Sequence, residues 1–525
     1  MNKFIKSKGF YLSAFTIIIT ILSIVISCNK LDLQPLDRVT TDTYYKTASD
    51  FDGAVFAAYS SIQDFWGTST ETLNEFGEFW NLTLAVTDDA DADPNRANGR
   101  ALDLDRLLIR ASDIPYQALY TQVYEGILRA NLVIENADGE NELTDEQKTQ
   151  FIAEGKFLRA FFHFLALQVW GTPPLVLEVK KDLNNLASPN ATKDELYAAI
   201  LSDLQAAYAG LPPQWDPANL GRATKWTARA FEGKVDVWKE DWDAAITAFA
   251  DVKQNGPYKL MPNYEDAFDF QKENGPESIF EIQFGGPFSD DNIWVFDDTH
   301  SEAFKASQGI SRVWFFDPAG ASSDITKPNA PGGHLGYFVP TQNLVDEFEP
   351  GDPRFFTSVY KTGDTLHTID GGKINVLPYD SSWSSTHYSI KKYGGKRNAQ
   401  TGDYSPNNQS QFNNERWYRY AEMLLLYSEA LIKKGRTAEG LAVINNEIRK
   451  RVGLGPTPIA DPMKALMHEK RVEMAFEPHR WFDITRWGIG AEIFGSKWND
   501  KYKIFPFPQS EVDRSKGLLK QNEGY

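Results

Sequence analysis

Three carboxylates at helical spacing are the first side chains in this 525-residue chain that could carry out a reaction. Glu469, Glu473 and Glu477 recur every fourth residue, so they would share one face of a helix. Hydrolysis of a glycosidic bond needs two carboxyl groups about 5 to 10 Å apart across the sugar ring. Arg471 and Arg480 stand close by in the sequence, and ion pairs that brace the fold are the simpler interpretation. We therefore expect these carboxylates to be structural rather than catalytic.

An acidic run in the first fifth of the chain resembles the start of a calcium-binding loop. Within residues 88–94 (DDADADP), Asp89, Asp91 and Asp93 fall at the first, third and fifth positions, where such a loop supplies oxygen ligands. The sixth position, which needs glycine for a sharp turn, holds Pro94, and the twelfth holds an arginine where a bidentate glutamate is required. We expect a solvated acidic loop that binds no metal ion.

Other catalytic motifs are missing from the sequence. The seven histidines show no His-Glu-x-x-His or other metal-ligand spacing, and there is no phosphate-binding loop. No Gly-x-Ser-x-Gly motif marks a serine nucleophile. We therefore expect a protein that is not an enzyme and that needs no cofactor.

Tryptophans on irregular segments favour a binding role. A flat aromatic ring packs against the apolar C–H face of a sugar, while neighbouring polar groups bind its hydroxyls. Core packing is the alternative for each ring, because most tryptophans are largely buried. The candidate ligand-binding residues are Trp66, Trp80, Asn81 and Asp89 in a first irregular segment, and Trp294, Trp314 and Trp383 in a second. We expect at least one of the tryptophans to contact a ligand.

Composition and charge narrow the class of ligand. Hydrophobic residues make up 42% of the chain, which is enough to build a large core. The formal net charge is -18, from 54 basic and 72 acidic side chains. Such a surface repels nucleic acid and anionic lipid headgroups. Neutral ligands remain possible.

The N-terminus predicts export and a lipid anchor. Lys3, Lys6 and Lys8 precede an apolar run over residues 10–27 that contains no charge, as in a signal peptide. The run ends at Cys28, the only cysteine of the chain, which is placed like the acylated cysteine of a bacterial lipoprotein. An uncleaved membrane-spanning anchor is the alternative, because the run is near the lower length limit for crossing a bilayer.

The rest of the chain predicts paired helices. Residues 226–240 and 241–255 form the clearest pair, with alanine and glycine where two helices would cross. Further expected helices cover 416–434 with 437–451, 116–137 with 146–170, and 192–209. A unit of about 34 residues is typical of tetratricopeptide repeats. Unrelated amphipathic helices are the alternative interpretation.

Two long stretches interrupt the helices. Residues 65–104 and about 258–414 are rich in glycine, proline, aspartate, serine and aromatic residues. Irregular segments of this length in a compact protein are usually functional. We expect a few short strands within them, for example over residues 278–284.

Several motifs, in order along the chain, resemble the SusD/RagB family. They are LDLQP at 31–35, EGKFLRA at 154–160 with WGTPPL at 170–175, GRAT at 221–224, YAEMLLLYSEA at 420–430, EKR at 469–471 with HRWFDITRW at 479–487, and FPFP at 505–508 with the terminal QNEGY. The family usually has proline where this chain has Glu523. Together the motifs extend over nearly the whole chain after residue 28.

The resemblance implies a mainly α-helical, tetratricopeptide-like fold with long irregular insertions. It implies a lipoprotein signal peptide at 1–27 and a single SusD-like domain at 28–525, with an inserted loop region at about 258–414. It further implies a surface-exposed lipoprotein of the outer membrane, anchored through Cys28, that binds an oligosaccharide and delivers it to a SusC-like TonB-dependent transporter. The same role for peptides or another nutrient, or a glycan-active enzyme, remains the alternative.

Overall fold

A computed structural model describes residues 44–63, 78–182, 186–284, 336–370, 373–393 and 413–525. The chain divides into two units, Met1–Lys46 and Thr47–Tyr525. Only residues 44–46 of the first unit are described, and they form a short turn in which the Lys46 N–H donates to the Tyr44 carbonyl. Everything below concerns the second unit.

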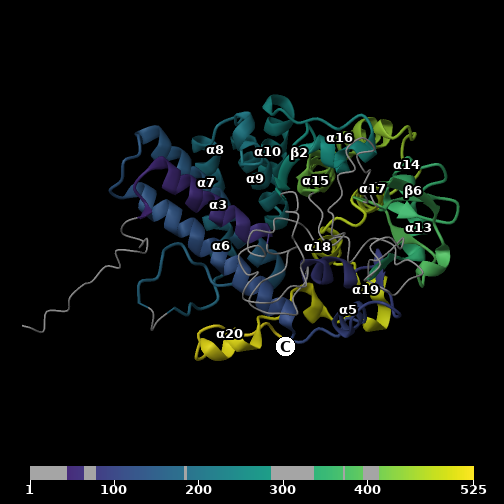
Figure 1. Ribbon diagram of the computed structural model, residues 1–525, viewed down its shortest axis with the longest axis horizontal. Coiled ribbons are helices and arrows are strands. Elements are labelled where there is room, and N and C mark those ends of the chain that lie inside the picture. Colours follow the sequence, from purple (N-terminus) through teal and green to yellow (C-terminus); the bar gives the residue numbers. More distant parts are fainter. Residues whose placement is uncertain (1–43, 64–77, 183–185, 285–335, 371–372, 394–412) are drawn as a thin grey trace, which may run out of the picture. The chain divides into compact units, whose positions relative to one another are not determined.

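An array of six long helices dominates the N-terminal half of this unit (Figure 1). They are α3 (Ala48–Gln63), α6 (Ile114–Asp138), α7 (Asp145–Trp170), α8 (Lys193–Gly210), α9 (Lys225–Lys239) and α10 (Trp242–Asn255). Each of α7, α8 and α9 packs between the helix before it and the helix after it, and α3 lies against α6 and α7. The predicted helices at 116–137, 146–170, 192–209, 226–240 and 241–255 are confirmed to within a few residues.

Local sequence explains where these helices begin and how closely they approach. Thr144 and Thr192 each accept a hydrogen bond from the backbone N–H three residues on, and that residue's side chain bonds back to the threonine N–H. Gly233 of α9 faces α10, where a Cβ atom would lie 2.5 Å from the Phe249 ring. The α9–α10 crossing therefore depends on glycine at this position.

The C-terminal part supplies a second helical group. It contains α15 (Tyr420–Lys433), α16 (Thr437–Val443) continued by a π-helical turn (Ile444–Arg449), α17 (Pro462–Glu473) and α18 (Arg480–Trp487). α15 packs against α10, α16 and α17, which joins the two helical groups. The structure corrects one boundary, because the predicted helix at 416–434 begins only at Tyr420. Glu415–Arg419 form strand β8, whose side chains are all buried.

Strands occur only as two-stranded antiparallel pairs in the described residues. The pairs are β1 (Ala90–Ala92) with β3 (Phe338–Pro340), β2 (Ser278–Ile282) with β8, β4 (Val359–Tyr360) with β7 (Ser389–Ile390), and β5 (Thr365–Asp370) with β6 (Lys373–Pro378). The strand predicted at 278–284 is thus confirmed, though it ends at Ile282.

Short helices complete the second unit. The α-helical ones are α4 (Glu78–Trp80), α5 (Gly99–Asp105), α13 (Gln342–Glu347), α14 (Pro353–Ser358), α19 (Gly490–Phe494) and α20 (Gln509–Arg514), and a π-helical turn (Asn81–Ala85) follows α4. The 3-10 turns are Pro217–Asn219, Tyr264–Phe268, Phe270–Lys272, Ser381–Trp383, Gly495–Lys497 and Asp500–Lys503.

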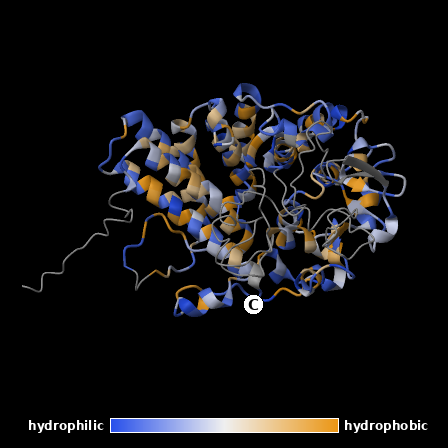
Figure 2. Cartoon of the chain, viewed as in Figure 1, coloured by the Kyte–Doolittle hydropathy of each residue, from blue (hydrophilic) through white to orange (hydrophobic). Residues whose placement is uncertain are grey.

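One large hydrophobic core runs through both helical groups and the β2–β8 pair. Hydrophobic and hydrophilic residues alternate around the long helices, as expected for helices with one face toward a core (Figure 2). Within the described ranges, no helix combines the length and the apolar character needed to cross a bilayer.

Candidate functional site

The two irregular segments that carry the predicted ligand-binding residues meet in the structure. Strand β1 of the first segment pairs with β3 of the second, with Ala90 opposite Pro340 and Ala92 opposite Phe338. The Asp93 N–H donates to the Tyr337 carbonyl at 2.8 Å, which extends the pairing by one residue. Backbone hydrogen bonds therefore hold together two segments that are about 250 residues apart in sequence.

A turn further along the second segment, which carries Trp383, completes this junction. The backbone N–H of Ser385 donates to the Asp93 carboxylate at 3.0 Å. Trp383 is half-buried, and its ring meets the Tyr379 ring edge-on, with centroids 5.8 Å apart. Tyr379 in turn stacks on Tyr360 at 5.7 Å. We call the residues 88–93 and 379–385 the loop junction.

The Trp383 ring is held firmly but keeps unused hydrogen-bonding capacity. The Tyr379 hydroxyl shares a 2.9 Å hydrogen bond with Ser389 on β7, which fixes the aromatic ring on which Trp383 rests. Among the described residues, the buried Nε1 of Trp383 has no hydrogen-bond partner. A buried indole N–H without an acceptor is unusual in a stable interior and is expected where water or a ligand supplies the acceptor.

Two arginines from the C-terminal helices α17 and α18 bind the acidic residues of the loop junction. Arg471 of α17 donates to the Asp89 carboxylate at 2.7 Å, and Arg480 of α18 donates to both Asp88 oxygens at 2.8 and 2.7 Å. Burial by itself would raise the pKa of Asp88, but the two guanidinium groups lower it below its usual range. Burial raises the pKa of Asp89, against the effect of Arg471. These ion pairs tie the start of β1 to the C-terminal helices.

The rim of the loop junction carries two further carboxyl groups, Asp91 and Asp105. Asp91 is exposed, and Asp105 accepts a hydrogen bond from the Ala92 N–H at 3.1 Å. Burial raises the pKa of Asp105 to about 6 and also raises the pKa of Asp91. The rim therefore offers carboxyl oxygens that can accept hydrogen bonds.

The predicted ligand-binding residues differ in how deeply they are buried. Trp383 lies at the loop junction, half-buried. Trp80, Asn81 and Asp89 are at most 1% exposed, so burial argues against the ligand contact predicted for them. Trp80, the last residue of α4, packs into the hydrophobic core, Asn81 is buried at the start of the π-helical turn, and Asp89 is occupied by Arg471. The remaining predicted residues, Trp66, Trp294, Trp314 and Cys28, lie outside the described residues.

The expectation of a solvated acidic loop is wrong. Asp89 and Asp93 are each 1% exposed, and only Asp91 of the three points to solvent. The reason is that Arg471 and Arg480, which are almost 400 residues away in sequence, pair with Asp88 and Asp89, and that Asp93 accepts a hydrogen bond from the Ser385 N–H. Since the Asp89 carboxylate is taken up by Arg471, the three aspartates do not converge as a calcium-binding loop would require.

The carboxylates at helical spacing are structural, as predicted. Glu469, Glu473 and Glu477 are all 0% exposed, and each is paired with cationic side chains. Glu473 contacts Arg419 and Arg354 at 3.2 and 3.3 Å. α17 ends at Glu473, so Glu477 lies beyond the helix rather than on its face. Fully buried and paired carboxylates cannot reach a sugar ring.

Sequence reasoning missed a hollow beside α3. Its walls are the C-terminal half of α3, the residues Leu220, Gly221 and Arg222, and strand β2. Its cavity volume is about 400 Å3, which is within the range of small-molecule sites. We call this feature the α3 hollow. No sequence motif marks it, because its walls come from three separate parts of the chain.

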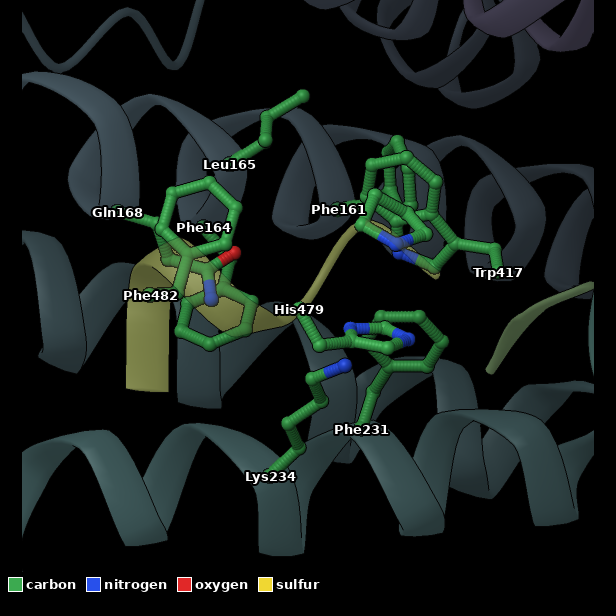
Figure 3. A pocket seen from close by; sticks show the side chains of 10 residues that line it. Phe161, Phe164, Leu165, Gln168, Phe231, Lys234, Trp417, His479 and Phe482 are labelled. Carbon is green, nitrogen blue, oxygen red and sulfur yellow. The ribbon is translucent and has the colours of Figure 1, made fainter. Parts of the chain in front are cut away.

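A second, much smaller pocket lies between α7, α9 and the start of α18 (Figure 3). Aromatic rings surround it, and Lys234, His479 and Gln168 supply polar groups. Only about 10 Å3 is accessible to the centre of a water molecule, which is room for about one water. Burial lowers the pKa of His479 far below its usual range, so its imidazole is neutral. This pocket is too small for a sugar.

Two family models match the chain. One is described as the SusD family and matches residues 276–525. The other is described as starch-binding and associating with the outer membrane, and it matches residues 64–236. A SusD-like protein of Formosa agariphila is 25% identical over 541 residues, which cover 97% of this chain and 99% of that protein. The starch-binding protein SusD of Bacteroides thetaiotaomicron is 22% identical, over 78% of each chain.

Solved structures share the fold. A laminarin-binding SusD-like protein gives a TM-score of 0.74 at 24% identity, covering 92% of this chain and 100% of that one. Surface glycan-binding protein A of Bacteroides thetaiotaomicron gives 0.71 at 22% identity, with 92% and 100% covered. These similarities confirm the predicted mainly α-helical fold with tetratricopeptide-like repeats.

Proposed function

Since the chain belongs to the SusD/RagB family, we propose that it captures a neutral oligosaccharide at the outer membrane and passes it to a SusC-like TonB-dependent transporter. The observation that carries this proposal is the loop junction. The junction contains a half-buried tryptophan, Trp383, whose ring meets that of Tyr379, and it also carries the carboxyl groups of Asp91 and Asp105. An aromatic ring flanked by polar groups suits the apolar and polar faces of a sugar.

Relatives support the class of ligand. Their names describe binding of starch, of laminarin and of glycans. Starch and laminarin are both uncharged glucose polymers, and a chain with a net charge of -18 suits an uncharged ligand better than an anionic one. We propose a glycan of this neutral class.

The lipid anchor belongs to the same proposal. Cys28 would carry the acyl chains, because it follows the apolar run of the signal peptide and is the only cysteine. Two or three acyl chains hold a protein on a membrane durably. The description of one matching family as associating with the outer membrane supports this location.

We propose a binding role without turnover, because the names of the relatives describe binding proteins. Glycoside hydrolysis needs two carboxyl groups facing one sugar ring. At the loop junction Asp88 and Asp89 are engaged by arginines, which leaves Asp91 and Asp105 on its rim. Both have raised pKa values caused by burial, but Asp105 is also fixed by the Ala92 N–H. We propose that these groups accept hydrogen bonds from sugar hydroxyls.

The test is a binding screen of the soluble chain, residues 29–525, against starch, laminarin, xylan and mannan. Affinity electrophoresis would measure retardation, and calorimetry would measure the dissociation constant. We expect one polysaccharide class to retard the wild type, and Trp383→Ala to weaken its binding at least tenfold.

Trp226→Ala is the matched control, because Trp226 is also half-buried but lies on α9 of the helical array. It should bind like the wild type. If no polysaccharide retards the wild type, or if both variants bind equally well, the proposal is refuted.

A further inference from the structure

We propose that the α3 hollow is a second glycan site, which takes one sugar ring of the same neutral polysaccharide that binds at the loop junction. This inference rests on the proposed function. The two sites have no lining residue in common, since the hollow is built from α3, residues 220–222 and β2.

The first reason is an exposed aromatic platform. Phe56 of α3 is 49% exposed, which is unusual for a phenylalanine, and it lines the hollow. The Arg222 guanidinium lies 5.3 Å from the Phe56 ring centroid and 4.3 Å from the Trp215 ring centroid. Arg222 thus links the two rings and holds Phe56 from one side. The exposed part of the Phe56 ring remains free to pack against a sugar.

The second reason is that the positive charge in the hollow is already neutralised. Arg222 is the cationic side chain of the hollow, and the buried Glu154 carboxylate binds it through both oxygens. Its remaining nitrogen donates to Asp52 at 2.9 Å and to Asn219 at 2.9 Å. The guanidinium is therefore paired with two carboxylates, so the hollow favours an uncharged ligand over an anion.

The third reason is an available acceptor beside the platform. The Gln63 side chain donates its amide N–H to the Gln283 carbonyl, which fixes the orientation of the amide. Among the described residues, the Gln63 Oε1 has no partner, and this half-buried residue lines the hollow one turn of α3 after Tyr59. Leu220, 54% exposed, adds apolar surface. An apolar wall with a fixed amide acceptor is the arrangement that binds one pyranose.

Two sites on one compact unit would act together on a long glycan. After one site has bound a polymer, binding at the second becomes intramolecular and strengthens the overall affinity without any new contact. A short oligosaccharide that fills one site gains nothing from the other. The proposal therefore predicts that the second site strengthens the binding of a polymer but not the binding of a short oligosaccharide at the other site.

The experiment compares Phe56→Ala, Trp383→Ala and the double variant, with Phe356→Ala as the control. Phe356 is 47% exposed but lies on α14, away from the hollow. Affinity electrophoresis would use starch and laminarin, and calorimetry would use maltotriose and laminaritriose. Circular dichroism would verify folding, which the loss of a half-exposed ring should not disturb.

We expect Phe56→Ala to weaken polysaccharide binding about tenfold, and the double variant to lose the retardation that remains in Trp383→Ala. Phe356→Ala should bind like the wild type. If Phe56→Ala binds polysaccharide as tightly as the wild type while Trp383→Ala does not, the second site is refuted and the proposed function survives. If no polysaccharide retards the wild type, both proposals fail. A wild-type dimer that Phe56→Ala dissociates in sedimentation would instead identify the hollow as an interface between two copies.

Discussion

Replacing Glu473 with glutamine tests whether buried ion pairs hold the two helical groups and the inserted region together. The Glu473 carboxylate is 0% exposed and lies 3.2 Å from Arg419 and 3.3 Å from Arg354. Arg451 also pairs with it. These arginines belong to β8, to α14 of the inserted region and to the segment after α16. Burial by itself would raise the pKa of Glu473, but the three guanidinium groups lower it to about 2.

The magnitude follows from this pKa. An unfolded glutamate titrates near about 4.3, so a folded pKa of about 2 corresponds to about 3 kcal/mol of stability at neutral pH. Removing one partner of a buried ion pair typically costs ~3–5 kcal/mol, which agrees in size. We therefore expect Glu473→Gln to lower the free energy of unfolding by about 3 kcal/mol at pH 7.

The lowered pKa of Glu473 also determines how its contribution to stability changes with pH. Since the folded pKa is lower than the unfolded one, the contribution of Glu473 is present above about pH 4.3 and is lost as the pH falls toward 2. The difference in the free energy of unfolding between the wild type and Glu473→Gln should therefore be nearly constant from pH 7 to 5, and it should become smaller below pH 4.

Urea unfolding followed by circular dichroism at pH 7, 5, 4 and 3.5 measures both effects. Glu439→Gln is the matched control, because Glu439 also pairs with an arginine, Arg436, but lies on the surface. The control should leave the unfolding midpoint unchanged. The reasoning is refuted if the free energies of unfolding of Glu473→Gln and the wild type differ by less than about 1 kcal/mol at pH 7. It is also refuted if their difference stays the same from pH 5 to 3.5.

Two further predictions concern the loop junction and the helix crossings. Burial raises the folded pKa of Asp105 to about 6, so its ionisation costs stability as the pH rises from about 4 to 6. Asp105→Asn should therefore melt at a higher temperature than the wild type at pH 7 and at the same temperature at pH 3.5, and a gap independent of pH would contradict this. Gly233→Ala should lower the free energy of unfolding by ~1–3 kcal/mol despite the better helix propensity of alanine, because its Cβ would lie 2.5 Å from the Phe249 ring. Gly99→Ala in α5, where a Cβ would meet nothing within 4 Å, should leave the urea midpoint unchanged or raise it; equal effects of the two substitutions would contradict the packing argument.

The helices were predictable because their signals are local. Caps such as Thr144 and Thr192, and a small residue such as Gly233 at a crossing, act within a few positions of the chain. These signals predict the bounds of α7, α8 and α9 to within a few residues. The family motifs add the order of the helices and the class of fold.

The strand β8 was not predictable from local sequence. Its residues 415–419 (ERWYR) run directly into a strong helical pattern, and two arginines do not suggest a buried strand. They are buried because partners far away in sequence neutralise them: Arg419 pairs with Glu277 and Glu473, and Arg416 with Glu281. Such long-range charge pairing has no local signature.

The loop junction was predictable only in outline. The two irregular segments meet at the β1–β3 pair, but the acidic run is buried because Arg471 binds Asp89 across 382 residues. One tryptophan in an irregular segment is core, as Trp80 shows, while another, Trp383, is half-buried. Only the packing around each ring decides between the two outcomes.

A crystal structure of the soluble chain with its retained glycan tests the central claim most directly. The account predicts sugar density packed against the Trp383 ring, with a sugar hydroxyl within hydrogen-bonding distance of Asp91 or Asp105. Sugar bound at a surface that contacts neither the loop junction nor the α3 hollow would contradict it.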